Sequence, residues 1–235
     1  MNTKKTALIT GASQGFGLNL AEALAAEGWQ LLINGRNAER LLQAQKSLAQ
    51  HTKVIAISGD VRDEIHLLQL RDALLHQGWK LNLVVNNASA LGTSPLSNLL
   101  EHPVDNLHEL YHTNIIAPIS LLQKVKSYLL PDAQVINLSS DTGVEAYAGW
   151  GAYGSSKAAL DHLSAILAQE QPQLHIYALD PGDMRTSMHQ AAFPGEDISD
   201  RPLPGQIAIP AVLQLIEKQL PSGRYIASDL VAAYA

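Results

Sequence analysis

The sequence contains no cysteine in its 235 residues. This absence excludes disulfide bonds, thiol catalysis and cysteine-ligated zinc. The nine histidines are scattered without the spacing of metal ligands, so we expect no metal site. No stretch approaches the roughly 18 uninterrupted apolar residues of a membrane span. The apolar run at residues 6–10 is too short for a signal peptide and is interpreted as a strand. These features predict a soluble protein of a reducing compartment, the cytoplasm.

The chain also lacks any run of like charges. Lys and Arg number 16 and Asp and Glu number 22, which gives a net charge of -6 without a basic face. Such a balance argues against nucleic acid as a partner. No internal repeat or low-complexity tract divides the sequence. With 235 residues, 46% of them hydrophobic, the chain suits one domain spanning residues 1–235.

Short apolar runs alternate with longer amphipathic ones along the whole chain. The runs favour strands at residues 6–10, 30–34, 53–57, 82–85, 133–138, 174–179 and 224–227. The amphipathic stretches favour helices at residues 15–27, 38–50, 64–77, 107–129, 153–170 and 207–219. This alternation predicts βαβ units, and the strands lack the period-two polarity of half-exposed ones. We therefore expect an α/β, doubly wound (Rossmann-like) fold, a mostly parallel seven-stranded sheet with helices on both faces.

Residues 183–205 break this pattern. They contain several prolines and glycines and show no sustained periodicity, apart from a short helix expected at residues 187–192. A loop of this length in a compact domain is usually functional, and it emerges where parallel sheets bind ligands. We interpret the segment as a substrate lid; a surface insertion without function is the alternative.

A glycine-rich turn follows the first predicted strand. Gly11, Gly15 and Gly17 lie in the sequence TGASQGFG, directly before a predicted helix. Glycines at such a turn let the backbone approach a diphosphate, which the free amides and the dipole of the helix start favour. The spacing, GxxxGxG, differs from the GxGxxG of other dinucleotide-binding proteins. The turn therefore predicts a dinucleotide site, although glycine-rich turns without a ligand also occur.

The end of the second predicted strand favours one nicotinamide cofactor over the other. An NAD enzyme places Asp or Glu there to bind the ribose hydroxyls. This chain has Gly35 at that place, followed by Arg36, whose guanidinium suits a 2′-phosphate. We expect NADP(H) to be preferred over NAD(H), with a purely solvated Arg36 as the alternative. Asp60, after the third strand, is placed to cap a turn or to contact adenine.

Three side chains predict carbonyl or alcohol redox chemistry. Tyr153 and Lys157 are four residues apart in a predicted helix and so share a face, and Ser140 precedes Tyr153 by thirteen residues. A free phenol has a pKa near ~10, and a neighbouring cation stabilises its anion. Lys157 is positioned to lower the pKa of Tyr153. YxxxK also occurs by chance, so the pair is informative only together with the other motifs.

These motifs together resemble the short-chain dehydrogenase/reductase family, in its compact subfamily of about 250 residues. The resemblance runs from Thr10 to about Ile226, and its motifs occur in the family's order: TGASQGFG at 10–17, NNAS at 86–89, Asn114, Ser140, YxxxK at 153–157 and PGDMRT at 181–186. The chain departs from the family at Ser89, where NNAG is usual, and at Gln14, where many NADP-dependent relatives carry Arg or Lys.

The resemblance implies roles for individual residues. Tyr153 is the expected general acid or base, Lys157 lowers its pKa and holds the nicotinamide ribose, and Ser140 binds the substrate oxygen. Asn114 is expected at a helix irregularity, holding a water that connects Lys157 to solvent. The expected cofactor-binding residues are Gly11, Ser13, Gln14, Gly15, Phe16, Gly17, Asn34, Arg36, Asp60, Val61, Asn87, Ala88, Tyr153, Lys157, Pro181, Gly182 and Thr186.

The loops after the strands predict a mostly apolar substrate pocket, whose expected lining residues are Leu91, Tyr147, Trp150, Met184 and Met188. Such a slot suits a hydrophobic ketone, aldehyde or diketone. Arg185 is an alternative carboxylate clamp. The function predicted is NADP(H)-dependent carbonyl reduction; an idle NADP(H) sensor or scaffold and an epimerase or dehydratase are the alternatives. The resemblance also suggests homodimers or homotetramers formed through the helices at 107–129 and 153–170.

Overall fold

The computed structural model describes residues 4–233. Its centre is a seven-stranded sheet in the order β3-β2-β1-β4-β5-β6-β7, with every neighbouring pair parallel. The strands are β1 (Thr6–Ile9), β2 (Gln30–Gly35), β3 (Val54–Ser58), β4 (Leu81–Asn86), β5 (Leu129–Leu138), β6 (His175–Asp180) and β7 (Gly223–Ile226). The predicted fold class is confirmed.

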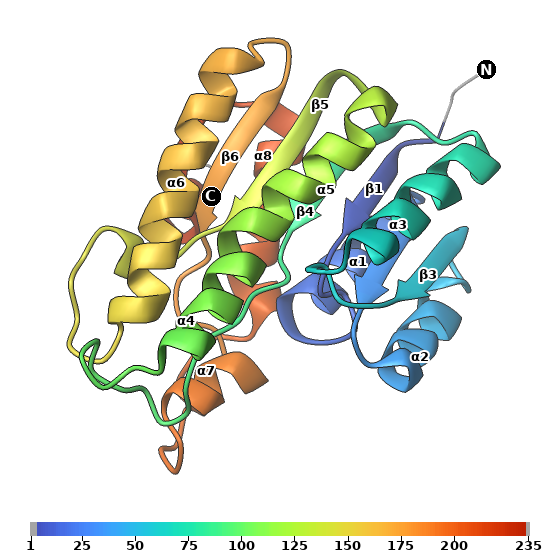
Figure 1. The fold of residues 1–235 in the computed structure, drawn as a ribbon. Helices are drawn as coiled ribbons and strands as arrows, with labels where there is room; N and C mark the ends of the chain where they lie inside the picture. The colour runs from blue at the N-terminus through green and yellow to red at the C-terminus, as the bar shows by residue number, and fades with distance from the viewer. Residues whose placement is uncertain (1–3, 234–235) are drawn as a thin grey trace.

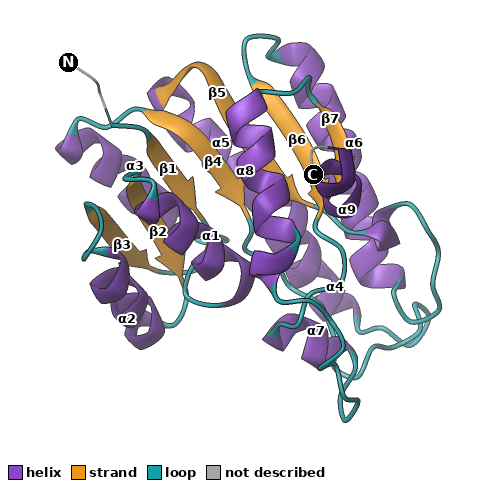
Figure 2. Cartoon of the chain, turned by 180° about the vertical axis from the view of Figure 1, so that it is seen from behind, coloured by secondary structure: helices purple, strands orange, loops and turns teal. Residues whose placement is uncertain are grey.

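Helices cover both faces of this sheet. Figure 1 views the face of α3 (Glu64–Gln77), α4 (Val104–Tyr111), α5 (Ala117–Val125) and α6 (Gly151–Glu170). Figure 2 shows, from behind, α1 (Gly15–Ala26), α2 (Ala38–Leu48), α8 (Ala208–Lys218) and α9 (Ala227–Ala233). Neighbouring residues of one strand pack on opposite faces: Ile9 joins the α1 and α8 core, and Leu8 joins the α3 and α5 core. Burial on both faces explains the continuous apolar strands.

The predicted helix at residues 107–129 is interrupted. The structure has α4, a π-helical turn at His112–Ile116, α5 and a 3-10 turn at Lys126–Tyr128, and β5 begins at Leu129 instead of residue 133. Helix α6 begins at Gly151, two residues before its predicted start. Helix α9 was not predicted, because residues 227–233 follow β7 without a turn signal. The irregularity expected at Asn114 is the π-helical turn.

The segment at residues 183–205 contains α7 (Ser187–Ala192), the short helix that the sequence predicts. Thr186 caps this helix through its hydroxyl, which accepts a hydrogen bond from the His189 amide at 3.2 Å. The Ser94 hydroxyl donates to the carbonyl of Ala191 at 2.7 Å, and so attaches α7 to the loop after β4. Closure of this segment over a substrate remains a prediction.

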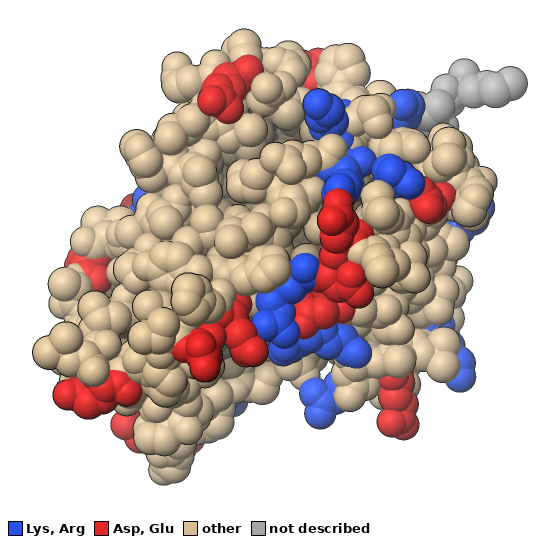
Figure 3. Space-filling view, viewed as in Figure 1, with Lys and Arg blue, Asp and Glu red and all other residues tan. Residues whose placement is uncertain are grey.

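Charged side chains of both signs are intermixed on the face that carries α3 and α5 (Figure 3). Ion pairs on this face include Lys124 with Glu64 and Arg62 with Asp60. In residues 4–233, no helix is long and apolar enough to cross a membrane.

Candidate active site

The predicted site residues gather at the carboxyl edge of the sheet. Thr10, Arg36, Asp60, Asn87, Ser140 and Pro181 each follow a strand closely, and parallel strands end at the same edge. Two adjoining cavities open there. One lies along the glycine turn and the end of β2, and the other lies between Tyr153 and α7. Met184, Thr186 and Met188 line both cavities, so the two form one continuous site.

Gly11 and Gly17 of the glycine turn pack so closely against Asn87 that a side chain at either position would collide with it. A Cβ on Gly17 would lie 2.5 Å from Asn87 Nδ2, and a Cβ on Gly11 would lie 2.8 Å from the same atom. Asn87 Nδ2 donates to the carbonyls of Thr10 and Gly11 at 2.8 and 3.0 Å. The turn is therefore tied directly to the loop after β4.

The start of α1 fits a phosphate group. Its N-cap, Gln14, makes no side-chain cap, and the first turn contains no acidic residue. Gly15 and Phe16, in the first turn of α1, line the cavity. Free amides and the helix dipole favour an anion at this place. A dinucleotide diphosphate suits these donors.

Two arginines also line this cavity. Arg36 and Arg40 are both exposed. Arg40 Nη1 donates to Gln14 Oε1 at 2.6 Å, so a guanidinium lies beside the N-cap residue of α1. Sequence reasoning identified Arg36 but missed Arg40, which lies four residues further along, in α2.

Asn34 and Asp60, two of the predicted cofactor-binding residues, line this cavity and have internal partners. Asn34 is buried; its Oδ1 accepts from the Gly11 amide at 3.4 Å, and its Nδ2 donates to the Gly59 carbonyl at 2.9 Å. Asp60 Oδ2 accepts from Arg62 Nη2 at 2.8 Å, and this hydrogen bond holds the pKa of Asp60 below its ordinary value. Both side chains brace the cavity wall.

Tyr153 and Lys157 point to one side of α6. Lys157 Nζ lies 5.3 Å from the centre of the Tyr153 ring and donates to the Leu138 carbonyl at 2.7 Å. Burial lowers the pKa of Lys157 to about 8, against the opposing charge of Asp161. Burial also raises the pKa of Tyr153, and a hydrogen bond with the Ser89 hydroxyl opposes this increase. The lowered phenol pKa that the sequence predicts is not found here, because burial outweighs every favourable contact.

Ser140 lines the same cavity as Tyr153. Ser140 Oγ donates to Asp141 Oδ1 at 2.8 Å and accepts from Thr142 Oγ1 at 3.0 Å. The neighbouring Ser139 also lines the cavity, but its buried hydroxyl has no hydrogen-bond partner among residues 4–233. Asp141 and Thr142, which sequence reasoning did not single out, thus set the orientation of the Ser140 hydroxyl.

Asn114 lies in the π-helical turn and is almost fully buried. Its Oδ1 accepts from the Ser89 hydroxyl at 3.0 Å and the Ala90 amide at 2.8 Å; its Nδ2 donates to the Ala90 carbonyl and to Ser156 Oγ, both at 2.9 Å. The side chain therefore joins the loop after β4 to α6. The water contact expected of Asn114 remains a prediction. A hydroxyl at position 89, absent from the usual NNAG, reaches both Asn114 and Tyr153.

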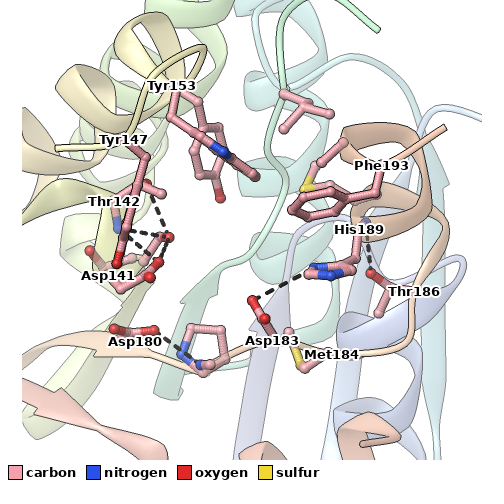
Figure 4. A pocket seen from close by; sticks show the side chains of 18 residues that line it. Asp141, Thr142, Tyr147, Tyr153, Asp180, Asp183, Met184, Thr186, His189 and Phe193 are labelled. Carbon is pink, nitrogen blue, oxygen red and sulfur yellow. Dashed lines mark hydrogen bonds and ion pairs between the residues drawn. The ribbon is translucent and has the colours of Figure 1, made fainter. Parts of the chain in front are cut away.

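The cavity beside Tyr153 has a volume of about 240 Å³. Trp150 packs against Tyr153 and Phe193, with ring centres 5.7 and 6.0 Å apart. Figure 4 shows the phenol of Tyr153 and the ring of Phe193 on opposite sides of the opening. All five residues predicted to contact substrate line this cavity: Leu91, Tyr147, Trp150, Met184 and Met188.

The charged residues that line this cavity are acidic. Asp141, Asp180 and Asp183 line it, together with His189. At its mouth, the hydrogen bond to Glu145 raises the pKa of Tyr147 to about 12. Arg185, the alternative carboxylate clamp, lies instead beside a separate surface hollow. Within residues 4–233, no group of three or more His, Asp or Glu side chains could hold a metal ion.

Comparisons with known proteins agree with this geometry. The family model described as short chain dehydrogenase matches residues 5–197. Sepiapterin reductase of Bos taurus is 30% identical over 201 residues, which cover 79% of this chain and 74% of that protein. A Haemophilus influenzae protein named "Probable NADP-dependent dehydrogenase" is 31% identical over 201 residues, which cover 82% and 77% of the two chains.

A solved structure has the same arrangement of elements. The crystal structure of a Shigella flexneri 2a short chain dehydrogenase complexed with NADP superposes with a TM-score of 0.89 at 27% identity, covering 96% of this chain and 97% of that one. The matched sequence, the parallel sheet and the cavities at its carboxyl edge lead to one conclusion: this chain belongs to the short-chain dehydrogenase/reductase family of oxidoreductases.

Proposed function

We propose that the protein is an NADPH-dependent reductase that converts a ketone, aldehyde or diketone to the alcohol. The observation that supports this most directly is that Tyr153 and Ser140 line the same cavity. This cavity adjoins the one along the glycine turn. NADPH supplies the hydride when bound, and the hydride adds to the carbonyl carbon. Negative charge then develops on the carbonyl oxygen, where hydrogen-bond donors and an acid stabilise it.

Two hydroxyls act on this oxygen: that of Ser140 binds it, and that of Tyr153 protonates it. The Ser140 hydroxyl donates to Asp141 in this structure, and rotation about its C–O bond turns the proton to the substrate oxygen. Tyr153 donates its proton to the same oxygen and becomes a phenolate. The ammonium of Lys157 and the hydroxyl of Ser89 stabilise that phenolate. In the reverse direction the phenolate is the base.

The cofactor is NADPH because two cations and no carboxylate of β2 face the ribose end of the cavity. Arg36 and Arg40 stand there, and guanidinium groups suit phosphate oxygens. A relative named as NADP-dependent and a solved relative complexed with NADP support this preference.

The substrate is an uncharged or cationic carbonyl compound with an apolar or aromatic group. Trp150, Phe193 and Met188 provide apolar surface. Among residues 4–233, the cavity is lined by three carboxylates and by neither Lys nor Arg; two of these carboxylates are paired from outside the lining, Asp180 with Arg224 and Asp183 with Arg201. A carboxylate placed beside Asp141 would be repelled. Keto acids are therefore expected to be poor substrates.

Loss of NADPH absorbance tests this function with a matched pair of carbonyl compounds. The methyl ester of phenylglyoxylate and phenylglyoxylate itself share the aryl ketone, and the ester lacks the negative charge. We expect KM to be at least about tenfold lower for the ester, the effect of one unfavourable charge contact; KM is compared because the ester also makes the ketone more electrophilic, which raises kcat. Alcohol must form in equal amount to the NADPH lost. Binding of NADPH without turnover of any carbonyl compound would contradict the proposal and favour a sensor.

The protein forms a homo-oligomer through α4, α5 and α6 in this proposal. Apolar side chains are exposed on α4, on α6 and on the π-helical turn between α4 and α5: Val104 is 64% exposed, Ile116 52% and Ile166 40%. Exposed large apolar side chains are candidates for burial in an interface between copies of the chain. Light scattering of the protein and of Ile116→Glu measures the mass, which should fall to that of a monomer in the variant.

A further inference from the structure

One arginine of the edge strand reaches under the proposed active site. Arg224 lies on β7, beyond residues 5–197 that the family model matches. Its Nε donates to Asp161 Oδ2 at 3.0 Å, and its Nη2 donates to Asp180 Oδ2 and to the main-chain carbonyl of Ser140, both at 3.1 Å. One side chain thus joins three segments that are distant in sequence.

Each of these segments carries part of the proposed site. Ser140 contributes its hydroxyl to the substrate cavity. Asp161 lies on α6, one helical turn after Lys157. Asp180 ends β6, and its Oδ1 accepts from the Gly182 amide at 3.0 Å, which holds the turn expected to meet nicotinamide.

Burial makes these contacts specific. The Asp180 side chain is 6% exposed, that of Asp161 15% and that of Arg224 27%. Burial raises the pKa of Asp180, whereas the Gly182 amide and the charge of Arg224 oppose this. A planar guanidinium can donate to all three oxygen acceptors at once, and a lysine ammonium on a flexible stem has no such fixed fork.

We propose that Arg224 is a positioning residue, which fixes the Ser140 loop, the Pro181-Gly182 turn and helix α6 relative to one another. The role rests on the proposed function, because it concerns the geometry in which the hydroxyls of Ser140 and Tyr153 meet one carbonyl oxygen. Arg224 contacts no reacting atom; it acts through the main chain of Ser140 and the carboxylates of Asp161 and Asp180. Displacement of positioning groups by about 1 Å costs on the order of a hundredfold in rate.

The test compares Arg224→Lys with Arg71→Lys. Arg71 pairs with Asp72 on α3, away from both cavities, so it controls for the loss of an arginine in an ion pair. At about pH 6.5, below the pKa of about 8 of Lys157 in the unchanged protein, we expect kcat of Arg224→Lys to fall at least about tenfold. The Kd for adenosine 2′,5′-bisphosphate, which probes only the adenosine end of the site, should stay within about twofold of its original value. Arg71→Lys should change neither quantity.

Amide hydrogen exchange gives a readout that needs no substrate. Exchange at residues 139–143 and 180–186 should accelerate about tenfold in Arg224→Lys and remain unchanged in Arg71→Lys. An Arg224→Lys protein with the original kcat and the original exchange at these residues would overturn the proposal. If the unchanged protein reduces no carbonyl compound, the proposed function fails, and the exchange rates still decide the role of Arg224.

A second variant covers the case in which Arg224→Lys does not fold. Asp161→Asn keeps Arg224 bound to Asp180 and Ser140 but weakens its attachment to α6. We expect kcat to fall about threefold to tenfold at about pH 6.5, with faster exchange at residues 139–143. Unchanged kcat together with unchanged exchange in Asp161→Asn would equally overturn the proposal.

Discussion

The two arginines at the end of the cofactor cavity should together determine the preference for NADPH. Arg36 and Arg40 line the cavity, and Arg40 is held at 2.6 Å from Gln14 Oε1. In the proposed binding mode both arginines contact the 2′-phosphate, so replacing either with alanine removes one cation from that contact and leaves the first-turn amides of α1 in place. NADH, which lacks this phosphate, should be nearly unaffected.

The size of the expected effect depends on how exposed the two guanidinium groups are. A hydrogen bond between a guanidinium and a phosphate oxygen stabilises a complex by about 1.5–3 kcal/mol. Both guanidinium groups are exposed, so solvent and salt screen them. We therefore expect about 1–1.5 kcal/mol for each, or about tenfold for each arginine and about a hundredfold for the double variant.

The assay is the ratio of kcat/KM for NADPH to kcat/KM for NADH. Arg36→Ala and Arg40→Ala should each lower this ratio about tenfold, and the effect should shrink at high salt. Arg36→Asp should lower it further, because a carboxylate repels the phosphate and suits the ribose hydroxyls. Gln14→Ala is the control for the Arg40 contact, since it frees Arg40 without removing its charge. A ratio that stays constant in Arg36→Ala and Arg40→Ala would refute this assignment.

Three further predictions concern the catalytic residues and the glycine turn. The pKa of Lys157 is about 8 in the folded protein, against an ordinary value of 10.5. Between these two pH values the folded protein therefore binds fewer protons than the unfolded chain. Stability relative to Lys157→Met should therefore rise from pH 8 to 10.5, by up to about 3 kcal/mol in denaturant titrations; a constant difference would contradict the low pKa. Because the hydrogen bond with the Ser89 hydroxyl opposes the rise in the pKa of Tyr153, Ser89→Gly should slow alcohol oxidation at a fixed pH of about 9 by up to about tenfold. An unchanged rate would exclude this contact. Gly17→Ala places a methyl group 2.5 Å from a side-chain amide nitrogen and should destabilise the fold by about 1–3 kcal/mol, whereas Gly205→Ala, with no atom within 4 Å of its Cβ, should leave the midpoint of thermal unfolding unchanged.

The sequence predicted the sheet well because its central strands, such as β1 and β4, are buried on both faces. The run LVV at residues 83–85 of β4 is apolar without alternation, and all seven predicted strands occur in the structure. The ends of elements were less predictable. β5 starts four residues earlier than predicted, after the 3-10 turn at Lys126–Tyr128, and its pairing with β4 contains a register shift that no local pattern encodes.

In the candidate site, too, features encoded by nearby residues were predictable from the sequence, and features that depend on contacts between distant residues were not. Tyr153, Lys157 and Ser140 were identified because their spacing is local or characteristic of a family. Arg224 gave no sequence signal, since its partners lie 84, 63 and 44 residues away along the chain. The raised pKa of Tyr153 likewise results from burial, which spacing on a helix does not reveal.

The most direct test of carbonyl reduction is a single turnover of NADPH by Tyr153→Phe. The phenylalanine keeps the ring that packs 5.7 Å from Trp150 and removes only the acidic hydroxyl. When enzyme-bound NADPH is mixed with the phenylglyoxylate ester, NADPH should be oxidised at least about a thousandfold more slowly by the variant than by the unchanged protein. The Kd of the variant for NADPH should stay within about twofold of the original value. A Tyr153→Phe protein that oxidises NADPH at the original rate would contradict the assignment of Tyr153 as the proton donor.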